Sequence, residues 1–173
     1  MKRVILDTNI YEFVLKEIDR DSLKKSIVAG DLIIYGNDII RRELRDIPKY
    51  KLNYSGENIQ NLRITLLSLY DLLVGKHHYM LNVDIEFLAD KYYIAFRALG
   101  GKIPRNEILN DFLIVACASV NNLDLVVSED RKTMLSEISI NSYKSVNGLY
   151  RYKMPEFIRF EKFKKLLRGV NLD

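Results

Sequence analysis

The sequence predicts an α/β fold in which helices cover both faces of a parallel sheet. Short apolar runs alternate along the chain with segments of helical periodicity. Two of these runs, residues 3–6 and 125–127, are followed at once by acidic and other polar side chains, as expected of strands that deliver functional groups to the carboxyl edge of a sheet. The chain has 173 residues, of which 48% are hydrophobic, enough for one substantial core. We therefore expect a single domain over residues 1–173.

The first elements follow from apolar runs and capping signals. Residues 3–6 are expected to form a buried strand. Asn9 is expected to cap a helix over residues 10–18, with Glu12 placed to complete a capping box. A second helix is expected over residues 20–29.

Residues 32–35 form the second predicted strand. The helix after it opens at Gly36 and Asn37. It ends before Pro48, because a proline disfavours the helical conformation in the residue that precedes it.

A long helical hairpin is expected next, inserted in the domain over residues 57–99. Its two arms are residues 57–74 and 84–99, where apolar side chains recur three and four positions apart. The loop between them covers residues 75–78, and Gly100 helps to end the second arm.

The last third of the chain continues the alternation of helices and strands. The segment 105–121 is the most continuously apolar helix candidate, and a strand follows at 125–127. We then expect a short helix at 131–137, a weak strand at 143–146 and a last helix at 155–168.

Composition limits the class of protein. The formal net charge is +4, from 27 basic and 23 acidic residues, which permits a polyanionic partner without requiring one. The single cysteine, Cys117, cannot form an internal disulfide and lies in an apolar helix where it is expected to pack. No apolar run approaches the ~20 residues of a membrane span, and the first strand leaves no room for a signal peptide. We expect a cytoplasmic protein without membrane attachment.

Four carboxylates stand where the chain is otherwise apolar or has just left an apolar strand: Asp7, Glu43, Asp111 and Asp130. Each also has an ordinary structural explanation. The three aspartates could be helix caps, and Glu43 could pair with a neighbouring arginine at the edge of an apolar helix stripe. For Asp130 taken alone, capping is the favoured explanation, so the argument depends on the four acids as a set.

Carboxylates gathered in one pocket repel one another and persist in the ionised form only with a compensating cation. Hard oxygen ligands of this kind select Mg²⁺ or Mn²⁺. Such an ion can activate a water and neutralise the charge that develops on a phosphodiester during in-line displacement. The pattern therefore predicts metal-dependent phosphodiester hydrolysis with water as the nucleophile.

The same residues resemble a known family, the PIN-domain nucleases, which include the VapC-type toxins of bacterial and archaeal toxin-antitoxin pairs. The resemblance covers nearly the whole chain and rests on four segments: Ile5-Leu6-Asp7-Thr8-Asn9, Ile40-Arg41-Arg42-Glu43-Leu44, Asn110-Asp111-Phe112-Leu113-Ile114-Val115-Ala116 and Leu125-Val126-Val127-Ser128-Glu129-Asp130. It implies a three-layer α/β/α fold with about five parallel strands. It also implies an acidic pocket for one or two Mg²⁺ or Mn²⁺ ions and endonucleolytic cleavage of RNA.

Carried over to this sequence, the resemblance makes Asp7, Glu43 and Asp111 the central acids and Asp130 the fourth. Asn9 and Ser128 correspond to polar residues that orient the acids. Ser128 stands where the family often has threonine, which keeps the hydroxyl. The stretch between the second and third acids is long for the smallest toxins, so the toxin assignment is less well supported than the fold.

Cations near the four acids are candidates for contact with RNA phosphates: Arg41, Arg42, Arg45, Arg105 and Arg131. Ordinary solvated helix faces explain any one of them equally well. His77 and His78 lack partners at metal-ligand spacing and are expected to be loop residues.

The last predicted helix alternates aromatic and basic residues, and its aromatic stripe is expected in the core or a dimer contact. Together with the hairpin it offers apolar surface that leads us to expect a homodimer. RNA is the expected substrate and an antitoxin protein a further expected partner.

Two other functions are compatible with these patterns. A catalytically silent PIN-like module would bind RNA or a protein without cleaving, and a nuclease assay separates it from an enzyme. A Mg²⁺-binding receiver domain of the phosphotransfer type also places acids at strand ends, but it needs an adjacent acid pair after the first strand. The sequence Asp7-Thr8-Asn9 supplies no such pair.

Overall fold

The computed structural model describes residues 1–19, 23, 25, 32–55 and 58–168. The main sheet has five strands in the order β5-β2-β1-β6-β7, and all neighbouring strands run parallel. They are β1 (Lys2–Leu6), β2 (Leu32–Asn37), β5 (His78–Tyr79), β6 (Leu125–Val127) and β7 (Glu156–Ile158). The predicted parallel sheet of four to five strands is confirmed.

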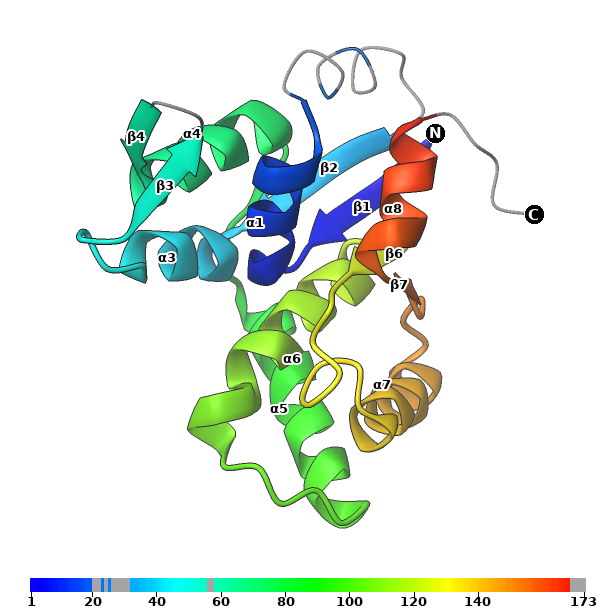
Figure 1. Ribbon diagram of the computed structural model, residues 1–173. Helices are drawn as coiled ribbons and strands as arrows, with labels where there is room; N and C mark the ends of the chain where they lie inside the picture. Colours follow the sequence, from blue (N-terminus) through cyan, green and yellow to red (C-terminus); the bar gives the residue numbers. More distant parts are fainter. Residues whose placement is uncertain (20–22, 24, 26–31, 56–57, 169–173) are drawn as a thin grey trace.

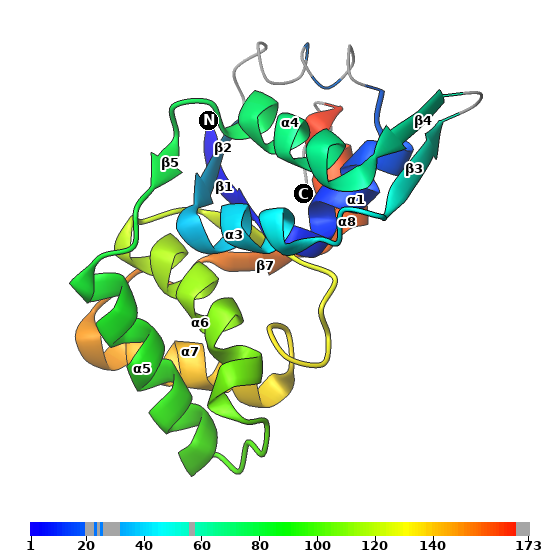
Figure 2. The same ribbon diagram turned by 90° about the vertical axis from the view of Figure 1, so that its left-hand side faces the viewer.

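Helices lie on both faces of this sheet and give three layers (Figures 1 and 2). One layer contains α1 (Thr8–Glu17), α4 (Leu62–Val74) and α8 (Phe160–Leu167). The other contains α5 (Val83–Ala98), α6 (Arg105–Val120) and α7 (Glu137–Tyr150). A further helix, α3 (Asp38–Asp46), begins directly after β2 and packs against both α4 and α6. The predicted α/β/α architecture is therefore present.

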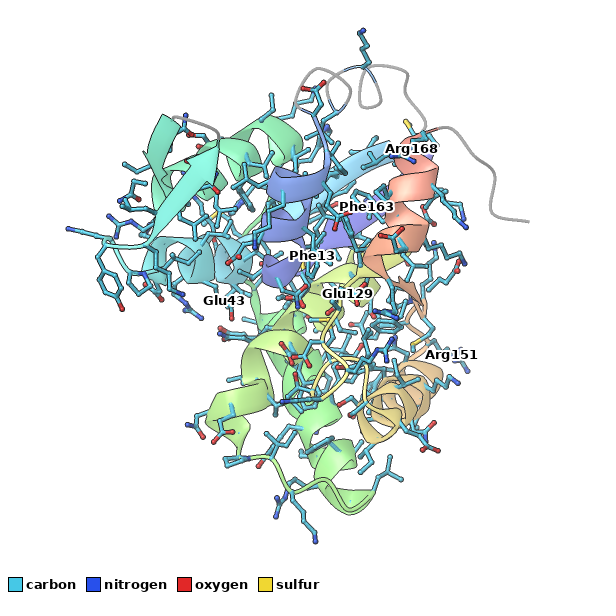
Figure 3. The ribbon with its side chains drawn as sticks, viewed as in Figure 1. Phe13, Glu43, Glu129, Arg151, Phe163 and Arg168 are labelled. Carbon is cyan, nitrogen blue, oxygen red and sulfur yellow. The ribbon has the colours of Figure 1, made fainter. Side chains whose placement is uncertain are left out.

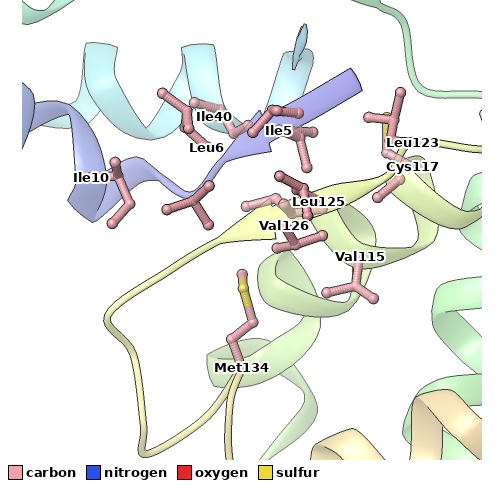
Figure 4. Packing of buried hydrophobic residues seen from close by; sticks show 14 of the residues in the cluster. Ile5, Leu6, Ile10, Ile40, Val115, Cys117, Leu123, Leu125, Val126 and Met134 are labelled. Atoms are coloured by element: carbon pink, nitrogen blue, oxygen red, sulfur yellow. The ribbon is translucent and has the colours of Figure 1, made fainter. Parts of the chain in front are cut away.

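The core is centred on the two middle strands. Ile5 and Leu6 of β1 and Val126 of β6 are fully buried, and Figure 4 shows them packed between Ile10 of α1 and Val115 of α6. Burying both faces of a strand requires a continuous apolar run rather than an alternating one. This is why these two short strands were identifiable from the sequence.

The helix after β1 begins two residues earlier than predicted. Asp7, not Asn9, is the N-cap, and its carboxylate accepts a hydrogen bond from the Thr8 amide. Asn9 lies inside the first turn, where its side chain is turned back toward Asp7. The helix predicted over residues 20–29 lies almost entirely outside the described residues.

The predicted helical hairpin over residues 57–99 is wrong. Its first arm begins only at Leu62, after an antiparallel pair of strands, β3 (Leu52–Ser55) and β4 (Asn58–Asn61). The two long helices also do not pair. Strand β5 lies between them and pairs with β2, so α4 packs on α1, α3 and β2 while α5 packs on α6 and α7.

The last third departs from the prediction after β6. Residues 131–135 form turns because the Asp130 carboxylate accepts the amides of Lys132 and Thr133 at 2.8 and 3.0 Å. Helix α7 then begins behind Ser136, whose hydroxyl accepts the Ser139 amide. The predicted helix at 131–137 and strand at 143–146 are therefore both wrong.

The predicted helix at 155–168 is a strand followed by a shorter helix. Residues 156–158 pair with β6 as β7, and α8 begins at Phe160. Phe160, Phe163 and Leu167 are buried, with the Phe160 ring 5.3 Å from that of Phe13 on α1. The aromatic stripe therefore belongs to the core of the chain.

The homodimer was expected from two features, and the structure supports neither, because the aromatic stripe is covered and the hairpin does not form. Dimerisation itself stays a prediction. Cys117 is fully buried in α6 as expected. Among the helices that the structure describes, none is long and apolar enough to cross a membrane.

Candidate functional site

Asp7 lies at the carboxyl end of β1, at the centre of the sheet, and only 5% of it is exposed. Its backbone amide bonds to the carbonyl of Val127, the last residue of β6, at 2.9 Å. The carboxylate accepts three hydrogen bonds, from the Thr8 amide at 2.7 Å, the Asn9 amide group at 2.7 Å and the Ser128 hydroxyl at 2.6 Å. The structure thus places both predicted supporting residues, Asn9 and Ser128, against Asp7.

Glu43 reaches the same edge from α3, on the side of that helix that faces α6 (Figure 3). One of its carboxylate oxygens accepts the Thr8 hydroxyl and the other accepts the Asn110 side-chain amide, the latter at 2.6 Å. Thr8 comes from the first turn of α1 and Asn110 from α6. Glu43 is therefore fixed by two donors that come from the elements carrying Asp7 and Asp111.

Asp130 lies in the loop after β6, three residues beyond the end of the strand. Its carboxylate accepts three hydrogen bonds from the turn that follows, from the amides of Lys132 and Thr133 and from the Thr133 hydroxyl. The Asp130 amide in turn donates to the Ser128 hydroxyl at 3.0 Å. Ser128 thereby links Asp130 to Asp7.

Electrostatics shows that the four acids share one environment. Burial raises the pKa of Asp7 from 3.8 to about 6, against the hydrogen bonds from Ser128 and Thr8, and repulsion from Glu43 and Asp130 adds to the rise. Each of these acids is close enough to disfavour ionisation of the buried one. Glu43 and Asp130 therefore lie near enough to Asp7 to influence its ionisation.

Asp111, on α6, completes the cluster. Burial raises its pKa from 3.8 to about 7, a hydrogen bond involving Thr133 works in the opposite direction, and repulsion from Asp7, Asp130 and Glu43 raises it further. A buried carboxyl that resists ionisation beside three other acids is the arrangement that a bound cation relieves. We call these four residues the acid cluster.

The chemistry of the acid cluster fits Mg²⁺ or Mn²⁺, because it offers only carboxylate oxygens with hydroxyls and amides around them. Among the described residues, however, no three His, Cys, Asp or Glu side chains form a group able to hold a metal ion as they stand. Two of the acids are engaged in hydrogen bonds, Glu43 with Thr8 and Asn110 and Asp130 with Thr133. Ion binding would have to exchange some of these bonds.

The sequence did not single out Thr8, Asn110 or Thr133. Each is next to an acid or three residues after it, a spacing at which short polar side chains readily bond to their neighbours. That signal is weak, because it also describes ordinary turns and caps. Their shared contact with the acids is a property of the tertiary structure.

The five predicted RNA-binding arginines differ in their contacts. Arg41 pairs with Asp71, and Arg105 pairs with Asp90 at 2.5 Å, so both charges are locally compensated. Arg42 reaches the Asn110 side chain at 3.4 Å. The remaining two, Arg45 and Arg131, are exposed.

Glu129, the acid next to Asp130, points away from the acid cluster. Its carboxylate accepts the Phe160 amide at 2.9 Å and pairs with Arg159, so it anchors the start of α8 to the loop after β6. Burial favours the neutral form of Glu129, but the hydrogen bonds donated by Arg159 and the Phe160 amide outweigh it and lower the pKa of this carboxyl. Its role is structural.

His78 is also not the loop residue that the sequence suggested. It begins β5, where its ring lies 2.7 Å from the Tyr70 hydroxyl and 2.9 Å from a carboxylate oxygen of Asp38. The other Asp38 oxygen accepts the Leu81 amide at 2.8 Å. This network ties the edge strand to the start of α3.

A pocket of about 320 Å³ opens at the junction of β4 and α4. Its lining consists of Gln60, Asn61, Ile64, Thr65 and Ser68. None of these is acidic, so the pocket is separate from the acid cluster.

Neither protein-family models nor curated proteins gave a match to the sequence. Solved structures do match. One is a chain in the crystal structure of VapBC2 from Rickettsia felis bound to a DNA fragment from their promoter, with 15% identity and a TM-score of 0.57 over 91% of this chain and 98% of that one. Another is in VapBC-1 from nontypeable Haemophilus influenzae, with 15% identity and a TM-score of 0.56 over 92% and 98%.

A third similar chain is in the structure of FitAcB from Neisseria gonorrhoeae, with 17% identity and a TM-score of 0.52 over 79% of this chain and 92% of that one. At these identities the likeness concerns the fold. The chain has a PIN-like fold of the VapC type.

Proposed function

We propose that the protein is a metal-dependent endoribonuclease and the toxin of a toxin-antitoxin pair. The observation that carries this proposal is the convergence of four acids from β1, α3, α6 and the loop after β6 at the carboxyl edge of the sheet. Open parallel sheets place their functional sites at that edge. The PIN-like fold supports the same conclusion, and RNA is the proposed substrate.

In this proposal Asp7, Glu43 and Asp111 hold Mg²⁺ or Mn²⁺, and Asp130 is a peripheral fourth acid. A bound ion would supply an activated water and neutralise charge on the phosphate under attack. Asn9 and Ser128 act on Asp7, since each donates to its carboxylate and fixes where the two oxygens point. Thr8 and Asn110 orient Glu43 in the same way.

Cations beside the acid cluster would position the RNA without reading its sequence. Arg42, Arg45 and Arg131 are the better candidates, because Arg41 and Arg105 already pair with carboxylates. The chain needs no covalent intermediate, since the proposed nucleophile is water. Cleavage would be a single displacement at phosphorus.

A protein partner is proposed from the similar structures, which are of VapBC and FitAB assemblies. An antitoxin of this chain is expected to be a small protein encoded beside it. Co-expression of a neighbouring small open reading frame, followed by co-purification, tests this part of the proposal. RNA and the antitoxin are both expected in the cytoplasm.

The decisive experiment is incubation of the purified protein with structured and unstructured RNAs in Mn²⁺, Mg²⁺ or EDTA. We expect cleavage only with metal. Asp7→Asn, Glu43→Gln and Asp111→Asn should each abolish it while RNA binding persists or improves, because a negative charge that faces phosphate is lost. Asp130→Asn should be milder.

The matched control is Asp84→Asn, which removes the same charge from an exposed position at the start of α5. It should cleave like the wild type. The hypothesis would be falsified if Asp7→Asn cleaved RNA in Mn²⁺ at the wild-type rate, with contaminating nuclease excluded by a mock purification.

A catalytically silent module is the second candidate. The observation in its favour is that the carboxylates of the acid cluster are engaged by hydrogen bonds and do not form a metal-holding group as they stand. Such a module would bind RNA equally well in Mn²⁺ and EDTA and leave it intact. The cleavage assay therefore separates the two candidates.

A further inference from the structure

The two strands β3 and β4 form a small sheet of their own, separate from the main sheet. Figures 1 and 2 show it standing off the body of the molecule, beyond the end of α3 and beside α4. We call residues 47–55 and 58–61 the β3–β4 arm; residues 56 and 57 are outside the described part of the chain. The arm follows α3 directly, and α3 carries Glu43.

The base of the arm is fixed by its backbone. The Leu62 amide donates to the Lys51 carbonyl at 3.0 Å and the Asn61 side chain donates to the Lys49 carbonyl at 2.6 Å. Asn61 also caps α4 by accepting the Ile64 amide at 3.2 Å. These bonds use main-chain groups of the two lysines and leave their side chains exposed.

The arm contributes little to the core. Tyr50 is 81% exposed and Leu52 is 45% exposed. A two-stranded hairpin is at best marginally stable by itself in water, so core packing does not explain an aromatic ring held in solvent on such an element. An exposed tyrosine on a fixed base is instead a preformed contact surface.

Several basic side chains gather at the base of the β3–β4 arm and are free of ion pairs with the described residues. Arg45, Lys49, Lys51 and Arg63 form no ion pair with any carboxylate in the described part of the chain; the Arg63 guanidinium donates to the Arg45 carbonyl. Uncompensated charge of one sign raises the local concentration of a polyanion.

We propose that the β3–β4 arm binds single-stranded RNA that leaves the acid cluster, with Arg45, Lys49 and Lys51 on its phosphates and one base stacked on Tyr50. This rests on the proposed function, because the acid cluster is where that strand would be cut. Arg45 lies in the last turn of α3, the helix that carries Glu43, and the arm with Lys49 and Lys51 follows that helix directly.

An unpaired strand fits better than a duplex. Base faces are available for stacking on an aromatic side chain only where bases are unpaired and can be splayed out. The positive charges contact phosphate and carry no sequence preference. The arm therefore selects for strandedness and not for sequence.

The test is fluorescence anisotropy of a labelled oligouridylate of about 12 nucleotides, a length within the range of single-strand binding surfaces, in EDTA so that cleavage does not interfere. Tyr50→Ala should weaken binding roughly tenfold, as the loss of one stacked base does. Tyr50→Phe, which keeps the ring, should bind like the wild type. A duplex of the same length should not distinguish Tyr50→Ala from the wild type.

The double variant Lys49→Ala/Lys51→Ala should reduce the magnitude of the slope of log affinity against log salt by about 1.4. Each phosphate contact on a single strand contributes about 0.7 to this slope, and two contacts are lost. The control Lys102→Ala/Lys144→Ala removes two exposed lysines from other elements and should keep the wild-type slope. Thermal melting checks that all variants are folded. The variants should stay folded, because the hydrogen bonds at the base of the arm are made by the main-chain carbonyls of Lys49 and Lys51 and not by their side chains.

Wild-type affinity in Tyr50→Ala, or equal losses in the two lysine pairs, would overturn the arm as an RNA site. Competition by polyglutamate as strong as by unlabelled RNA would also overturn it, in favour of an acidic protein partner. These results are independent of the nuclease proposal. If the wild-type protein never cleaves RNA but its binding depends on the arm, the nuclease proposal is excluded and the arm proposal stands. If cleavage requires Asp7 but binding does not depend on the arm, the arm proposal is excluded and the nuclease proposal stands.

Discussion

The metal-free protein should lose stability as the pH rises through the neutral range, and Asp111→Asn should remove most of that loss. In the unfolded chain Asp111 releases its proton near pH 3.8, but burial and the neighbouring acids raise its pKa to about 7 in the fold. Between these two values the folded state holds more protons than the unfolded state. The free energy of unfolding therefore falls with increasing pH in this window and levels off above it.

The size of the effect follows from 1.36 kcal/mol per pH unit. A rise from 3.8 to about 7 corresponds to about 4 kcal/mol for Asp111, and the rise of Asp7 from 3.8 to about 6 corresponds to about 3 kcal/mol. The two values do not add, because they share the repulsion between these carboxylates. We expect a total loss between pH 4.5 and 8 of about 3 kcal/mol or more.

Other carboxylates act outside this window. Burial opposes ionisation of Asp124 and Glu129, but their contacts with Lys153 and Arg159 lower the pKa of each below its usual value. A lowered pKa in an acid gives stability that is lost only when the pH falls through that lowered value. The stability that Asp124 and Glu129 provide is therefore lost only in acid. Between pH 4.5 and 8 the change in stability comes from the acid cluster.

The assay is urea unfolding followed by circular dichroism in EDTA at pH 4.5, 6, 7 and 8. Asp111→Asn should be more stable than the wild type at pH 8, by up to about 4 kcal/mol, and close to it at pH 4.5. Asp84→Asn, the exposed control, should follow the wild-type curve. The reasoning is refuted if wild-type stability stays level or rises from pH 4.5 to 8, or if Asp111→Asn keeps the wild-type slope.

Three further predictions concern metal, packing and assembly. Mn²⁺ should raise the melting temperature of the wild type more than that of Asp7→Asn or Asp111→Asn, and equal shifts in all three would remove the shared metal site. Gly36→Ala should cost about 1–3 kcal/mol in urea unfolding, because its Cβ would lie 2.1 Å from the Tyr70 hydroxyl oxygen. Gly148→Ala in α7, where an added Cβ meets nothing within 4 Å, should instead stabilise by about 0.5–1 kcal/mol. Light scattering tests the homodimer, which a monomer at every concentration would exclude.

Some of the acid cluster was accessible from sequence because its members sit beside strong local signals. Asp7 follows a fully buried strand, and Asp111 interrupts the most apolar helix of the chain. Burying a carboxylate in such a position is unfavourable, and local structure offers no interaction that compensates for the lost hydration. The residues that hold the acids gave no such signal. Thr8 and Asn110 are small polar side chains whose partner, Glu43, lies on another element, and Thr133 bonds to Asp130 within an ordinary turn.

The sequence by itself determined the elements with an unambiguous apolar pattern: β1, β6 and α6, whose predicted bounds differ from the observed ones by a residue at most. Tertiary structure decided the others. Strand β7 has three residues and exists through its pairing with β6, and the insertion of β5 beside β2 sends α4 and α5 to opposite faces of the sheet. Helix α7 contains polar and β-branched residues of low helix propensity and is stabilised by packing on α5. Pairing and packing of this kind join residues far apart in the chain, and local periodicity carries no information about such partners.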